Sequence, residues 1–216
     1  MKSSWDETKK RSRYHFDSTR FDPDQDRVVR LGFIEPCWAT ELKAIVEKSQ
    51  ATTWRTRGES GKIRPEEELA AEDYDLEREG YGKDYVISNL NWDIPPVLQE
   101  IADRFALEDA MTRIHVQLPG QVWNLHLDKL EKWCPENPDS VIRIQIQLTA
   151  WEPGQFWSYG NYCHSQWQAG DVATFDWQNI PHATANASHH PRVTLQVTGI
   201  KTAATDKFLK ELQNLN

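Results

Sequence analysis

Three features of this sequence predict a mainly β fold with helices packed against its outside. The stretch 111–200 divides into short segments rich in Val, Ile, Thr and aromatic residues, which Pro, Gly, Asn and Asp separate. Three of these segments alternate between apolar and polar residues. Apolar residues at helical spacing occur before and after the stretch. Seven or eight strands within about 90 residues indicate a β-sandwich or a β-barrel with flanking helices.

The first half of the chain supplies most of the flanking elements. Residues 1–27 are polar and of mixed charge, and we interpret them as an N-terminal arm. Residues 28–110 are expected to form a helical flank, with helices over 36–50 and 95–105. Residues 58–84 hold ten Asp or Glu against four Lys or Arg, which indicates an exposed acidic insertion. This insertion is either a solvated loop or a lid over a site.

The alternating segments say which residues share a face. Residues 111–200 form the expected β core and 201–216 a C-terminal amphipathic helix, within a single domain. In 112–118, 142–148 and 192–198 the apolar residues share one face and long polar residues share the other. Two arrangements fit this pattern. Either the polar face is wet, or the sheet is cupped and its polar face lines a pocket.

Composition argues against several classes of protein. No run approaches the roughly 18 apolar residues of a membrane span, and the first residues lack the apolar segment of a secretory signal. A formal charge of −8 and a pI near 5.4 argue against a broad nucleic-acid-binding surface. Cys37, Cys134 and Cys163 are too few and too widely spaced for a disulfide scaffold. We therefore expect a cytoplasmic protein.

Two histidines and an aspartate form a candidate metal site. His126 and Asp128 end the segment QVWNLHLD, and their i, i+2 spacing turns both side chains to one side of a strand. His182 follows in WQNIPHATANAS, at the end of another expected segment. Two imidazoles and one carboxylate on one side of an ion make the facial triad of non-haem Fe(II) oxygenases. An H-x-D pair alone is a common chance pattern, so the interpretation depends on further residues.

Arg192 strengthens the interpretation of these residues as the site of an Fe(II) oxygenase. It follows His182 by ten residues and lies in an R-V-T segment. Its planar guanidinium can bind a carboxylate through two hydrogen bonds. Thr194 shares the same face of the strand, so its hydroxyl can join this contact.

With these residues, the stretch 112–199 resembles the Fe(II)/2-oxoglutarate-dependent dioxygenases, which carry H-x-D, a distant H and then R-x-S/T. Within them it is most similar to the aspartyl/asparaginyl β-hydroxylase-like branch. The similar features are Pro119-Gly120, Arg143-Ile144-Gln145, the stretch 170–176 and Pro191-Arg192-Val193-Thr194. The sequence departs from the branch at Gln145, where His is frequent, and at Asp128, because some members lack the acidic ligand.

The resemblance implies a double-stranded β-helix, a cupin-like jelly roll with polar residues directed inward. It further implies that His126, Asp128 and His182 bind Fe(II), and that 2-oxoglutarate and O₂ are co-substrates. The implied reaction hydroxylates a C–H bond of an amino acid, free or within a peptide or protein. In the same reaction 2-oxoglutarate is converted to succinate and CO₂.

The resemblance also assigns contacts to the co-substrate. Arg192, assisted by Thr194, would bind its far carboxylate. Gln145, Arg143 or His115 would hold its near end.

Substrate contacts and alternative functions follow less directly. Trp123, Trp157 and Arg55 are candidate substrate contacts. A cupin-like metal enzyme that does not use 2-oxoglutarate stays open, as does a binding module that has lost its metal. Arg192 argues against the former and the intact triad against the latter. The net charge argues against a nucleic-acid substrate, and the sequence does not indicate an oligomeric state.

Overall fold

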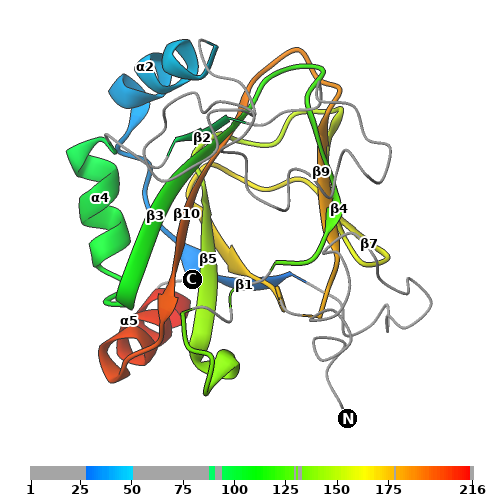
Figure 1. The fold of residues 1–216 in the computed structure, drawn as a ribbon. Coiled ribbons are helices and arrows are strands. Elements are labelled where there is room, and N and C mark those ends of the chain that lie inside the picture. The colour runs from blue at the N-terminus through cyan, green and yellow to red at the C-terminus, as the bar shows by residue number, and fades with distance from the viewer. Residues whose placement is uncertain are drawn as a thin grey trace, which may run out of the picture.

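The computed structural model of the chain describes residues 28–50, 88–90, 94–128, 130, 133–177 and 179–214. Two antiparallel sheets face each other (Figure 1). The larger sheet contains, in spatial order, β1 (Val29–Phe33), β8 (Asp171–Thr174), β5 (Val141–Gln147), β10 (Arg192–Ile200), β3 (Glu108–Gln117) and β2 (Ser88–Leu90). The smaller sheet contains β4 (Val122–His126), β9 (His182–Asn186), β6 (Gln155–Tyr159) and β7 (Tyr162–His164). A short 3-10 helix, η4 (Pro138–Ser140), precedes β5. The predicted fold class, a mainly β jelly roll with flanking helices, is confirmed.

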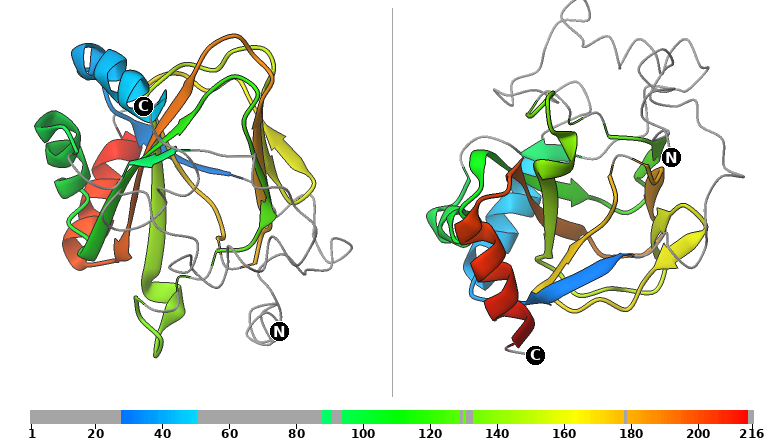
Figure 2. Two further views of the ribbon diagram at one scale, coloured as in Figure 1. Left: turned by 45° about the horizontal axis from the view of Figure 1, so that its top comes forward. Right: turned by 90° about the horizontal axis from the view of Figure 1, so that it is seen from below.

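Three helices cover the outer face of the larger sheet (Figures 1 and 2). They are α2 (Ala39–Gln50), α4 (Pro96–Asp103) and α5 (Ala203–Asn214). Pro96 stands in the first turn of α4, where its missing N–H costs no helical hydrogen bond. Apolar residues of these helices pack on apolar residues of β3, β5 and β10 in one core cluster, which includes Ile45, Leu98, Ile101, Leu212, Ile114, Val116, Ile144, Ile146, Val193, Leu195 and Val197. Burial of this face stabilises the sheet by the hydrophobic effect.

The polar side chains of β5 and β10 are also buried. Arg143, Gln145 and Gln147 of β5 alternate with Ile144 and Ile146, and every one of these residues is buried. On β10, Arg192, Thr194, Gln196 and Thr198 are buried in the same way. The polar residues therefore face the interior between the two sheets, as in the cupped arrangement. The arrangement with one wet outer face is wrong for these strands.

Some elements differ from the sequence-based expectation. Two strands, β1 and β2, lie within residues 28–110, where only helices and an insertion were expected. They lie at opposite edges of the larger sheet. The three residues of β2 are too few to show alternation, whereas VRLGF of β1 does alternate and could have indicated a strand. Strand β3 begins at Glu108, ahead of the expected core boundary. The N-terminal arm, 1–27, and the acidic insertion, 58–84, lie outside the described residues.

Two expectations from composition can be compared with the structure. Within the described ranges, no helix has both the length and the apolar character needed to cross a bilayer. Cys37, Cys134 and Cys163 are free thiols.

Gly170, directly before β8, allows the backbone that follows β1 to approach β8 closely. Gly170 has φ of +98°, donates to the Gln147 carbonyl (2.7 Å) and accepts from the Ile34 amide (2.9 Å). A Cβ at this position would overlap the Ile34 carbonyl oxygen. Gly120 also has positive φ (+84°), but no heavy atom of the described chain lies within 4 Å of where its Cβ would be.

We expect Gly170→Ala to destabilise the protein more than Gly120→Ala does. Both changes carry the left-handed backbone cost of about 1–2 kcal/mol, and Gly170→Ala adds an overlap worth about 1–3 kcal/mol. Urea unfolding followed by circular dichroism measures both free energies of unfolding. Equal costs at the two positions would contradict the close approach of β1 to Gly170.

Candidate metal centre

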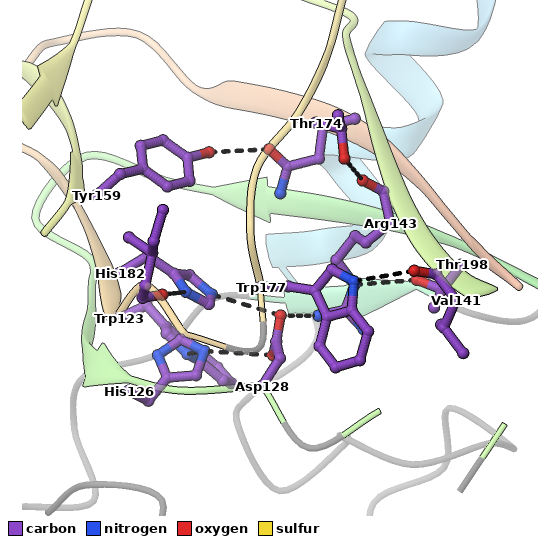
Figure 3. A network of polar contacts seen from close by, with 12 residues as sticks. Trp123, His126, Asp128, Val141, Arg143, Tyr159, Thr174, Trp177, His182 and Thr198 are labelled. Carbon is purple, nitrogen blue, oxygen red and sulfur yellow. Dashed lines mark hydrogen bonds and ion pairs between the residues drawn. The ribbon is translucent and has the colours of Figure 1, made fainter. Parts of the chain in front are cut away.

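The structure brings His126, Asp128 and His182 together inside the jelly roll (Figure 3). His126 ends β4 and His182 begins β9, and the two are directly paired across these antiparallel strands. Asp128 follows two residues after His126. One ligand atom from each side chain lies within 4.8 Å of the others, and all three residues are buried. The group can therefore hold a metal ion with two nitrogens and one carboxylate oxygen.

The His182 ring is held in an orientation that suits a ligand. Its Nδ1 contacts the Ile180 carbonyl oxygen at 3.3 Å, and its Nε2 lies 3.6 Å from Asp128 Oδ2. A backbone carbonyl on one ring nitrogen fixes the tautomer that leaves the other nitrogen for a metal. Phe175 packs edge-on against the same ring, with centroids 4.7 Å apart. The ring is thus positioned by the chain itself.

The His126 ring faces Asp128 and His182, and Trp123 lies beside it. Its Nε2 lies 3.8 Å from Asp128 Oδ1, and its ring centroid lies 4.3 Å from that of His182. The Trp123 indole N–H donates to His126 Nε2 at 2.9 Å. A metal ion would use the lone pair that accepts this bond, so metal binding would replace it. The structure therefore places Trp123, a predicted substrate contact, next to the candidate metal position.

Arg143 contacts the third member of the group. Its Nη1 forms an ion pair with Asp128 Oδ2, and its Nε donates to Thr198 Oγ1 at 2.9 Å. The resemblance implied Arg143, Gln145 or His115 as the contact for the near end of a co-substrate. In the structure Arg143 pairs with a candidate metal ligand.

Arg192 stands apart from these contacts as a buried cation that pairs with no anion of the described residues. It is 2% exposed, and within the described part of the chain its Nε and Nη1 have no hydrogen-bond partner. Its guanidinium lies over the Trp157 ring at 4.3 Å and near the Trp167 ring at 5.9 Å. Burial lowers the pKa of Arg192 to about 10. Because buried donors are costly when unpaired, this arrangement suits a carboxylate or another anion.

Thr194, Gln145 and His115 line the same interior. Thr194 donates to Gln147 Oε1 at 3.2 Å, and the Tyr159 hydroxyl donates to Gln145 Oε1 at 3.0 Å. Burial raises the pKa of Tyr159 well above its usual range, so its phenol stays a donor.

His115 lies opposite Thr194 across β3 and β10, and its buried Nε2 has no hydrogen-bond partner among the described residues. Burial holds the pKa of His115 well below its ordinary value. The guanidinium groups of Arg113, Arg143 and Arg192 lower it further, and Asp128 opposes them in part.

The remaining predicted substrate contacts are Trp157 and Arg55. Trp157 is buried against Arg192 and stacks on Tyr159, with centroids 5.3 Å apart. Arg55 lies outside the described residues. Sequence reasoning missed Tyr159 and Trp167. Alternation in QFWSYG places Tyr159 on the face of Trp157, which could have indicated it, whereas Trp167 lies outside the strands and carries no periodic signal.

Neither a family model nor a curated protein sequence matches the chain. Among solved structures, the chain is similar to a Cupin 2 conserved barrel domain protein from Salinispora arenicola, with 16% identity and a TM-score of 0.34 over 69% of this chain and 97% of that one. It is also similar to a predicted oxalate decarboxylase from Thermotoga maritima, with 14% identity and a TM-score of 0.35 over 54% and 83%. A third is the Cupin_2 domain of an XRE family transcriptional regulator from Enterobacter cloacae, with 12% identity and a TM-score of 0.34 over 54% and 97%. Likenesses at this level carry no argument about activity, and we base the jelly roll on the strand pairing.

The unpaired state of Arg192 predicts a gain in stability when its charge is removed. Arg192→Met keeps much of the volume and ends the cost of burying unsatisfied donors. We expect the free energy of unfolding of the ligand-free protein to rise by about 1–3 kcal/mol. Urea unfolding without metal or added anions measures it. A destabilised Arg192→Met would show that the contacts of the guanidinium with the Trp157 and Trp167 rings outweigh the cost of its unsatisfied donors.

The lowered pKa of His115 predicts a dependence of stability on pH. Below about pH 6.5 the unfolded chain binds a proton at this residue that the folded chain does not, so stability falls as the pH falls. His115→Gln should reduce that loss by up to about 1.4 kcal/mol per pH unit. Unfolding free energies measured from about pH 7 to about pH 5 test this. An unchanged slope would contradict the burial of a neutral His115.

Proposed function

We propose that this protein is an Fe(II)- and 2-oxoglutarate-dependent oxygenase that hydroxylates a C–H bond of an amino acid, free or within a peptide. The observation that carries the proposal is Arg192. It offers a buried guanidinium with unpartnered nitrogens to the same interior as His126, Asp128 and His182. A small dicarboxylate that also chelates a metal would use both features.

The donor set suits iron. Two imidazoles and a carboxylate are borderline and hard ligands, and they leave adjacent positions of an octahedral ion open. No cysteine belongs to the group formed by the described residues, which argues against a soft-metal site.

Strand β10 relates the anion anchor to the metal group. Arg192 and Thr194 lie at its beginning, on the interior face. Thr198 lies further along the same face and holds Arg143, which reaches Asp128. An elongated dianion with one carboxylate on Arg192 would extend along this face toward the metal group.

The chain's own residues would bind and orient the reactants. Arg192 and Thr194 would hold the far carboxylate of 2-oxoglutarate, and burial of the group would exclude water. Trp123, which is half-buried beside His126, would contact the substrate. Iron with bound 2-oxoglutarate would supply the oxidation, in which O₂ is consumed and 2-oxoglutarate is decarboxylated to succinate.

One observation favours a second candidate, a metal enzyme that does not use 2-oxoglutarate. Arg143, expected at the near end of the co-substrate, is engaged by Asp128 and Thr198. The metal group itself does not require Arg192.

Anaerobic spectroscopy distinguishes the two candidates. Fe(II) and then 2-oxoglutarate are added to the metal-free protein, and the visible charge-transfer absorption of the chelate is recorded. We expect a band for the natural sequence and no band for His126→Ala or His182→Ala. Arg192→Met should lower the affinity for 2-oxoglutarate by about tenfold or more, because a charge-assisted bidentate contact is lost. Arg104→Met, at an exposed position outside the barrel, is the matched control.

The possible results point in different directions. Iron binding without a band would favour the metal enzyme that does not use 2-oxoglutarate. Absence of iron binding would leave a binding module. If the band appears, release of succinate in the presence of O₂ identifies substrates among amino acids and peptides.

A further inference from the structure

We infer that Arg143 is a positioning residue for Asp128, and that it serves the metal ligand rather than the near end of the co-substrate. The inference rests on the metal-binding part of the proposed function. It does not depend on the use of 2-oxoglutarate.

Two contacts hold the guanidinium from different sides. Nη1 pairs with Asp128 Oδ2, and Nε donates to Thr198 Oγ1 at 2.9 Å. The backbone of Arg143 is fixed as well, because its carbonyl oxygen accepts a hydrogen bond from Thr174 Oγ1 at 2.7 Å. A side chain fixed at both ends gives Asp128 a defined partner.

The pair is buried, so each charge depends on the other. The side chains of Arg143 and Asp128 are 7% and 6% exposed. Removing one member of such a pair leaves the other charge uncompensated in the interior. Arg143 pairs with Oδ2, which also lies 3.6 Å from His182 Nε2, while Oδ1 lies 3.8 Å from His126 Nε2. The guanidinium thereby fixes a carboxylate orientation in which each oxygen faces one of the two histidines.

The contrast with Arg192 supports this division of roles. Both arginines are buried on the interior face of the larger sheet. Nε and Nη1 of Arg143 are engaged by Thr198 and Asp128, whereas within the described chain the same two nitrogens of Arg192 have no partner. One guanidinium binds a carboxylate of the protein, and the other offers its donors to a carboxylate from outside.

Binding of Co(II) in the absence of 2-oxoglutarate tests the inference. Co(II) replaces Fe(II) because its visible absorption reports both affinity and coordination. Second-shell partners of metal ligands typically contribute 10- to 100-fold in affinity. We expect Arg143→Gln to weaken Co(II) binding by about that factor and to alter the Co(II) spectrum. Arg143→Lys keeps the charge but not the two-sided contact, so we expect it to weaken binding as well.

Further variants keep the test interpretable. Thr198→Val removes only the acceptor of the Nε bond, and we expect weaker Co(II) binding even if a substitution at Arg143 prevents folding. Arg104→Gln, at an exposed arginine outside the barrel, is the control, and it should leave Co(II) affinity unchanged. Arg192→Gln is titrated separately with 2-oxoglutarate, whose binding it should weaken. Circular dichroism confirms folding before each titration.

The inference and the proposed function fail differently. Arg143→Gln with unchanged Co(II) affinity and weaker 2-oxoglutarate binding would return Arg143 to the co-substrate and overturn the positioning role. Tighter Co(II) binding would also overturn it, since removal of a positive charge alone would act in that direction. Failure of the natural sequence to bind Co(II) or Fe(II) would reject the metal site and the inference together. Failure to bind 2-oxoglutarate alone would reject only the proposed co-substrate.

Discussion

Strands β5 and β10 of the larger sheet are buried on both faces, and the polar side chains of these strands have to find hydrogen-bond partners without bulk water. The apolar face of β5 and β10 is covered by helices, as residues such as Ile146 and Leu195 show. The opposite face carries Gln145, Gln147 and Thr194, also buried. A buried polar group without a partner costs free energy, so each of these side chains must find one inside the fold. This requirement determines how the two sheets meet.

Polar pairs join one sheet to the other along the interior. Gln117 of the larger sheet donates to Thr184 of the smaller at 3.0 Å. Tyr159 of the smaller sheet donates to Gln145 of the larger, and Arg143 of the larger pairs with Asp128, which follows β4 of the smaller (Figure 3). These bonds are directional, so they fix the spacing and registration of the sheets more tightly than apolar packing does.

Alternation and motif spacing predicted which residues share a strand face and which are candidate metal ligands, but they did not predict the contacts between side chains. The i, i+2 rule placed Arg143 on the polar face and His126 with Asp128 on one side of their strand, because it depends only on backbone geometry. The pairing of Arg143 with Asp128 depends on how two separate sheets pack, which local sequence does not encode. The same reason hid the hydrogen bond from Tyr159 to Gln145, although alternation in QFWSYG could have indicated the face on which Tyr159 lies. Strand β2 was missed because its three residues are too few to show a pattern, and its formation depends on an available sheet edge. The alternation of VRLGF could have indicated β1.

The arrangement divides the candidate site between the two sheets. The smaller sheet supplies His126 and His182, and the loop after β4 supplies Asp128. The larger sheet supplies Arg192. A ligand that bridges a metal and Arg192 would require a fixed distance between these sheets. Arg143 belongs to the sheet of Arg192 and binds a member of the metal group, so it couples the position of the metal ligand to the position of the anion anchor. Without the ion pair to Arg143, a metal site supplied by the smaller sheet alone would have no such coupling. The ion pair at Asp128 therefore makes the distance between the metal ligands and Arg192 a property of the folded chain, set before any ligand binds.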